Sequence, residues 1–127
     1  MSFKLGQEKK HDLRGRREAY LRELKSGAIM KFEDLMTLIN DHYDYTPTAF
    51  TNGELENTID ENQGSAKLFC FAAIHQLTPL ETLHCFGQHY QEVLSTPNGH
   101  LHSNIRNFIT YGWNIRLTFD SPVLNRK

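Results

Sequence analysis

The chain has 127 residues, of which 39% are hydrophobic and 23% charged, and its formal net charge is −1. This length allows one domain with a buried core and excludes two independent domains. No stretch approaches the roughly 18 consecutive apolar residues of a membrane span, and the polar residues 1–10 lack the apolar segment of a signal peptide, so we expect a soluble cytosolic protein.

The N-terminal segment, residues 1–25, is basic, with eight Lys or Arg against four acids. Apolar residues at helical spacing and a stop at Gly27 predict a helix over residues 12–25. Those apolar residues are Leu13, Tyr20, Leu21 and Leu24. A basic arm can contact phosphates or acidic lipid, but we favour a solvated helix face that balances an acidic body.

That acidic body extends from Phe32 to Ile105, where Lys67 is the only basic side chain against ten acids. A segment with this balance repels nucleic acid, so no nucleic-acid partner is expected.

A second helix and a hairpin are predicted between residues 32 and 57. Apolar residues at helical spacing from Phe32, with two acids in the first turn, indicate a helix that ends before Pro47. Asn52-Gly53 lies within residues 48–57 and is the dipeptide that most readily adopts both positive φ angles of a tight hairpin turn.

Two further helices are predicted in the middle of the chain. Leu68 to Ile74 is apolar throughout, and flanking alanines with a length of about twelve residues favour a helix buried all round. The run Thr78-Pro79-Leu80-Glu81 has the pattern of a capping box, which starts a helix. Its apolar positions continue to Leu94, and Pro97 ends it.

The C-terminal quarter is predicted to hold a short helix and a strand. Ser103 can cap a helix that Gly112 terminates. Apolar and polar residues then alternate from Ile115 to Phe119, which is typical of a strand before Pro122. We expect residues 121–127 to form a frayed tail.

These elements predict an α+β fold: a mainly helical single domain of about five helices with a small two- or three-stranded β element. It divides into a basic N-terminal arm with the first helix (1–25), a main domain (26–120) and the tail (121–127).

The run from His42 to Phe50, HYDYTPTAF, followed by Asn52-Gly53, resembles the signature of the HopJ type III effector family. The likeness covers roughly residues 30–117 and makes the main domain HopJ-like. Its further blocks are Gly64-Ser65, Lys67, Phe69, Phe71-Ala72, Thr82-Leu83, Phe86-Gly87, Tyr90, Asn104-Ile105-Arg106-Asn107-Phe108 and Gly112-Trp113.

The resemblance implies a bacterial effector that a type III system can secrete, but it brings no catalytic residues that we can carry over. Two positions depart from the family pattern. Ala66 stands where we expect a cysteine in many relatives, and Leu101 stands where an Asp commonly precedes His102. Both departures weaken a mechanism based on a thiol or on an Asp-His pair.

Candidate site residues begin at the end of the second predicted helix. His42 and Asp44, with Tyr45 beside them, can face one cavity, where an imidazole near a carboxylate is a ready general base. The alternative, which we favour, is that His42 and Asp44 satisfy backbone groups at the helix end.

A possible anion site follows the hairpin. Gly64-Ser65 precedes a helix with Lys67 in its first turn, so backbone N–H groups, the helix dipole and a cation point at one place. Lys67 also has many acids as salt-bridge partners, which is the favoured interpretation. Arg106, flanked by Asn104 and Asn107, can converge on the same place or can brace the fold by binding carbonyl groups.

The pair His100-x-His102 is compatible with a metal that His42, His84 or His89 completes. This spacing is common by chance, and His84 and His89 do not share a helix face, so we expect no metal and no cofactor.

We also find no Ser, Cys or Lys in an activating motif, which favours a protein without enzymatic activity. Cys70 and Cys85 lie in an apolar run and on a predicted helix, which indicates a reducing compartment rather than a disulfide framework.

Two hypotheses of function remain open. The first is an effector that acts as a protein-interaction module and binds a protein partner through its acidic face or through a groove near Tyr45 and Trp113. The second is a protein or enzyme that binds an anionic small molecule in a polar pocket, with a histidine that moves protons. The residues of this candidate pocket are His42, Asp44, Tyr45, Asn52, Ser65, Lys67, His102, Asn104 and Arg106.

Overall fold

Helices dominate the computed structural model of this chain, which describes residues 2–114, 117–119 and 123–127, with side chains from Arg14 onward. The helices of this part are α1 (Ser2–Lys25), α2 (Phe32–His42), α3 (Gln63–Ile74), α4 (Pro79–Cys85), α5 (Gln88–Ser95), α6 (Ser103–Tyr111) and the 3-10 helix η1 (Gly112–Asn114). The strands are β1 (Tyr43–Tyr45), β2 (Phe50–Asn52), β3 (Leu55–Asn57), β4 (Leu117–Phe119) and β5 (Leu124–Arg126). The predicted α+β, mainly helical fold is therefore confirmed.

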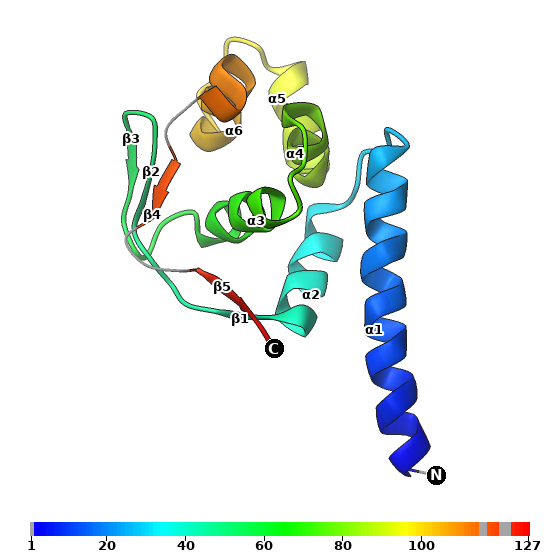
Figure 1. Cartoon of the computed structure of the whole chain (residues 1–127). Coiled ribbons are helices and arrows are strands. Elements are labelled where there is room, and N and C mark those ends of the chain that lie inside the picture. The colour runs from blue at the N-terminus through cyan, green and yellow to red at the C-terminus, as the bar shows by residue number, and fades with distance from the viewer. Residues whose placement is uncertain (1, 115–116, 120–122) are drawn as a thin grey trace.

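Helix α3 is the centre of the core, with α1 and α2 on one side, α4 to α6 at one end and the strands opposite (Figure 1). Its apolar sequence explains this position, because Leu68 and Phe71 are fully buried and Phe69 is 1% exposed. The Phe69 ring packs against Phe86 of the α4–α5 junction and Phe108 of α6, with centroids 5.5 and 5.2 Å apart. Each buried ring stabilises the fold by about 1.5–3 kcal/mol, so this cluster fixes α6 against α3.

Helix α1 packs along α2 and starts earlier than the sequence indicated (Figure 1). It begins at Ser2 rather than near Asp12, and it ends before Gly27, whose φ of 98° is the predicted stop. Tyr20 and Leu24 form its buried face. Arg16 of α1 lies 3.8 Å from Asp41 of α2, so a basic residue of this helix does meet an acid of the body.

The predicted hairpin is confirmed: β2 and β3 pair antiparallel, and β4 joins the other edge of β2 to give the order β3-β2-β4. The turn differs from the expected form. Asn52 is the last strand residue, opposite Leu55, and only Gly53 of the two turn residues has a positive φ, 65°. Asn52 stays in the strand because its side chain is fully buried and hydrogen-bonded there.

The frayed tail that we expected is wrong where the structure describes it. Strand β5 pairs antiparallel with β1, and Val123 just before it is only 2% exposed. The edge of β1 thereby gains backbone partners for its strand groups. Ile115 and Pro122, which entered our prediction of the C-terminal strand, lie outside the described residues.

The long helix predicted after the capping box is broken in two. Thr78 and Glu81 form both bonds of the box, at 3.1 and 2.9 Å, but α4 ends at Cys85 and α5 starts at Gln88. Gly87 makes this break, with φ 60° and ψ −124°. A Cβ atom there would lie 2.0 Å from the carbonyl oxygen of Met30, so the loop from α1 to α2 requires a glycine. The break turns α5 toward the start of α6.

Helix α6 starts at Ser103 and ends before Gly112, as predicted, but its N-cap residue is His102 rather than Ser103. His102 has a left-handed backbone, with φ 61° and ψ 50°. None of the helices within the described residues is long and apolar enough to cross a membrane.

Candidate functional site

The most polar cavity of the described chain lies where three segments meet: the start of α3, the α4–α5 junction, and the loop from residue 100 into α6. This cleft has a volume of about 470 Å³. Phe32 and Phe86 give it an aromatic wall, with their rings stacked at a centroid distance of 6.2 Å. The polar residues that line it are Asn62, Ser65, His89, His100, His102, Ser103 and Asn104.

Two helix N-termini face this cleft with the same local structure. Asn62 at the N-cap of α3 has φ 51° and ψ 38°, which matches the left-handed backbone of His102 at the N-cap of α6. Neither side chain caps its helix. Both helix starts therefore present the positive end of the dipole and the first backbone N–H groups on the side of the cleft.

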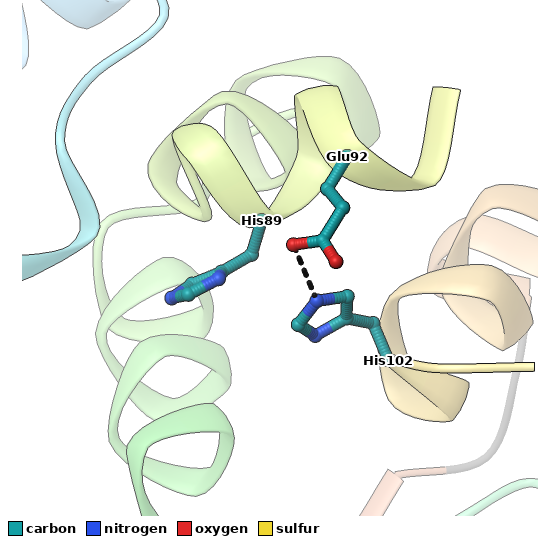
Figure 2. A group of neighbouring side chains, drawn as sticks. All are labelled: His89, Glu92 and His102. Carbon is teal, nitrogen blue, oxygen red and sulfur yellow. Dashed lines mark hydrogen bonds and ion pairs between the residues drawn. The ribbon is translucent and has the colours of Figure 1, made fainter. Parts of the chain in front are cut away.

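Three side chains with metal-binding chemistry meet at the rim of the cleft. His89 and Glu92 lie one turn apart on α5 and point toward His102 at the start of α6 (Figure 2). His102 Nε2 lies 3.1 Å from Glu92 Oε2, and the His89 and His102 ring centroids are 5.1 Å apart. The Phe32 ring packs edge-on to His89 at 5.1 Å and holds the imidazole on this side of α5.

Behind the cleft lies a closed network of asparagines. Asn104 Nδ2 donates to Asn57 Oδ1 at 2.9 Å, and Asn52 Nδ2 donates to Asn104 Oδ1 at 3.1 Å. Asn62 Nδ2 donates to Asn57 Oδ1 at 2.8 Å, and Asn107 Nδ2 donates to the Asn52 carbonyl. We name these five residues the asparagine network. It ties the starts of α3 and α6 to the β2–β3 hairpin and so fixes two walls of the cleft.

The structure brings only part of the predicted pocket together. Ser65, His102 and Asn104 line the cleft, and Asn52 lies behind it in the asparagine network. Arg106 points elsewhere: its guanidinium donates to the carbonyls of Thr96 and Leu101 and so braces the loop before α6.

The remaining predicted residues lie at the opposite end of α3 or on α2. The Lys67 ammonium lies 4.5 Å from the centre of the Tyr45 ring and 3.4 Å from Asn40 Oδ1, outside the lining of the cleft. Tyr45 donates its hydroxyl hydrogen to Gln63 Oε1, and burial raises its pKa.

His42 and Asp44 sit where α2 ends. His42 Nδ1 lies 2.9 Å from the Leu38 carbonyl oxygen in the last turn of α2, which is the backbone role that we favoured for it. Asp44 is exposed on β1. Neither residue shares a cavity with His102.

The cysteines are poor nucleophiles. Burial raises the pKa of Cys70 to about 12 and the pKa of Cys85 to about 12, so both thiols are protonated at neutral pH. Burial also raises the pKa of Tyr20, whose hydroxyl lies near Cys85. This agrees with the sequence, which has no activated nucleophile.

Sequence reasoning missed Glu92 and the pairing of His89 with it. We had compared His89 with His84, five residues away, although His89 and Glu92 have the three-residue spacing that places two side chains on one helix face. The pattern H-x-x-E was therefore visible. The proximity of His102 was not, because it depends on the break at Gly87.

Comparison with known proteins agrees with the sequence pattern. The family model described as HopJ type III effector protein matches residues 17–124. A crystal structure of an unknown function protein, VPA0580, is similar to this chain with a TM-score of 0.82 and 41% identity, over 87% of this chain and 92% of that one. Comparison with curated proteins finds no match. Since the family model spans most of the sequence, the chain belongs to the HopJ type III effector family.

Proposed function

We propose that this HopJ-family protein binds a small anionic molecule in the cleft between α3, α5 and α6. The observation that carries the proposal is that two helix N-termini without side-chain caps converge on one cavity that three histidines also line. Backbone N–H groups at helix starts favour negative charge, and the rings of His89, His100 and His102 add further donors.

The dimensions and the lining of the cleft suit a metabolite rather than a polymer. Its volume of about 470 Å³ lies within the usual range for small-molecule sites. One wall is aromatic, through Phe32 and Phe86, while the opposite side carries hydroxyl, amide and imidazole groups. This combination fits a carboxylate or phosphate group attached to a small apolar or planar body.

The test is a thermal-shift screen of the full chain against phosphorylated metabolites and carboxylates, with a chelator present so that metals do not contribute. A ligand at a hundred times its dissociation constant stabilises the folded state by about 2.7 kcal/mol. We expect His100→Ala, in the cleft lining, to lose the shift and His42→Ala, at the end of α2, to keep it. Equal shifts in both variants, or no shift for any compound, would remove the proposal.

A second candidate function is the protein-interaction module that the family name suggests. Four exposed acids, Glu54, Glu56, Asp60 and Glu61, lie on the β2–β3 hairpin and in the loop that leads to α3. A patch of this sign favours a partner with a basic surface, because complementary charge speeds association.

This second function has its own experiment. A translocation reporter fused to the full chain is expressed in a bacterium with an active type III system and in a matched strain without one. Signal in host cells from the first strain alone is expected for an effector. A charge-reversed Glu54→Lys, Glu56→Lys variant would then lose the host partner that the wild type captures, and equal capture by both would exclude the acidic surface.

A further inference from the structure

We infer that His89, Glu92 and His102 form a binding site for a divalent transition-metal ion of the zinc class at the rim of the cleft. Two imidazoles and one carboxylate are the donor set of protein sites that hold such an ion and leave a coordination position open. The link between this ion and a cleft ligand rests on the proposed function; the metal site itself does not.

The distances suit a metal ion. The ligand atoms of the three side chains all lie within 4.8 Å of one another, and the His102–Glu92 pair is already at 3.1 Å. Two ligands at about 2.1 Å from a tetrahedral ion lie about 3.4 Å apart, so rotations of about an ångström complete the site. Among the described residues, this is the one group of three His, Cys, Asp or Glu side chains that meets such a limit.

The scaffold holds each ligand from a separate structural cause. Helix α5 places His89 and Glu92 on one face, and the Phe32 ring fixes the rotation of His89. The left-handed backbone of His102 turns its ring toward α5 instead of over the first turn of α6, where a capping side chain would lie. The residue that departs from helix-capping chemistry is therefore one that supplies a ligand.

The site is also accessible and directed. The His102 side chain is 27% exposed and that of Glu92 is 49% exposed, so an ion can enter from solvent. His89 and His102 line the cleft while Glu92 does not. An ion held by the three would therefore have its open position on the cleft side, where an anionic group could complete the coordination.

An ordinary surface ion pair between His102 and Glu92 is the competing explanation, and it predicts no role for His89. Full-length protein freed of metal by chelation is titrated with Co²⁺ and followed by its visible absorption, and Zn²⁺ binding is measured by calorimetry. We expect one ion per chain and the intense spectrum of four- or five-coordinate Co²⁺. Losing a direct ligand should raise the dissociation constant at least tenfold, since even outer partners of a metal site cost roughly tenfold to a hundredfold.

The variants are His89→Ala, Glu92→Gln and His102→Asn, with His42→Ala as the matched histidine control. Circular dichroism verifies that each is folded, and Glu92→Gln preserves the shape of the site should an alanine variant unfold. Weaker binding in all three site variants with unchanged binding in the control is the expected result. A wild type with only the spectrum of hydrated Co²⁺, or a His89→Ala variant that binds as the wild type does, would overturn the inference.

Failure of the metal site and failure of the cleft can be told apart. A ligand shift that persists in chelator while Co²⁺ fails to bind would leave the proposed function standing without the metal. Co²⁺ binding that no anion alters would support the metal site and count against the cleft ligand.

Discussion

Two polar groups on neighbouring turns of the chain have opposite surroundings. Asn104 is 4% exposed, and its amide group bonds with Asn52 and Asn57. His102, two residues earlier, is partly exposed, and its printed hydrogen bond runs to the exposed Glu92. A buried polar group must be fully bonded, so it belongs to the fold. A half-exposed group with lone pairs to spare can bind a ligand without cost to the core.

The largest expected effect comes from the joint that aims α5 at α6. Gly87→Ala places a Cβ atom 2.0 Å from a backbone oxygen and forces a non-glycine residue to φ 60°. Backbone strain and overpacking together should lower the free energy of unfolding by about 4 kcal/mol. We also expect weaker Co²⁺ binding, because α5 must move. Chemical denaturation and the Co²⁺ titration measure the two effects.

Gly15→Ala is the matched control for that change. Gly15 lies on α1 with nothing within 4 Å of an added Cβ atom. Replacing a helical glycine with alanine should stabilise the protein by about 0.5–1 kcal/mol and leave Co²⁺ binding unchanged. If Gly87→Ala behaved like Gly15→Ala, the close approach at the joint would be wrong.

The next effect tests the asparagine network. Asn104→Ala leaves the buried amides of Asn52 and Asn57 without partners. Each orphaned group costs about 1–3 kcal/mol, so we expect a loss of about 3 kcal/mol in the free energy of unfolding. Asn98→Ala, an exposed asparagine, should change stability by less than about 0.5 kcal/mol. Equal denaturation midpoints for the two variants would contradict a structural role for the network.

Much of the closed region could be predicted from local chemistry. Apolar spacing, the capping box at Thr78 and the glycines at 27 and 112 predicted most helix ends, because these signals act within a few residues. The break at Gly87 could not be predicted in this way. It depends on the carbonyl of Met30, which is far away in sequence and meets Gly87 only in the folded chain.

The open region was harder to predict because its geometry is long-range. His102 and His89 were candidates, but only the turn of α5 brings Glu92 to the same point. Lys67 and Arg106 were grouped with the pocket on charge alone, and each instead uses its cation locally, against Tyr45 and against loop carbonyls. Strand β5 was missed because its partner β1 is also distant in sequence.

A smaller effect should come from a histidine that is enclosed rather than open. His75 Nε2 lies 2.9 Å from the Tyr43 hydroxyl, and burial lowers the pKa of His75, with nearby Arg17, Arg126, Lys25 and His42 acting in the same direction. The unfolded chain binds this proton more readily than the folded chain. Stability from His75 is therefore complete above the unfolded pKa of about 6.5 and is lost as pH falls through the lower, folded value.

Denaturation midpoints measured from pH 8 downward should show this loss. His75→Gln can still bond to the Tyr43 hydroxyl and does not titrate, so its stability should fall less steeply with acid than that of the wild type. The carboxylates with lowered pKa, Glu33 and Glu61, are common to both proteins and cancel in the difference. Parallel curves for the two proteins would mean that His75 is not desolvated.

The smallest expected effect on stability separates the two regions most cleanly. His102→Asn keeps the left-handed N-cap, a conformation that Asn tolerates well and that Asn62 already adopts at the start of α3. Only a half-exposed ion pair with Glu92 is lost, so we expect the free energy of unfolding to change by less than about 0.5 kcal/mol. The same variant should lose Co²⁺ binding at least tenfold, as a missing direct ligand requires. A residue whose removal leaves the fold intact and abolishes metal binding is kept for its ligand chemistry. A variant that instead lost several kcal/mol with unchanged Co²⁺ affinity would place His102 with Asn104, among the residues that hold the fold.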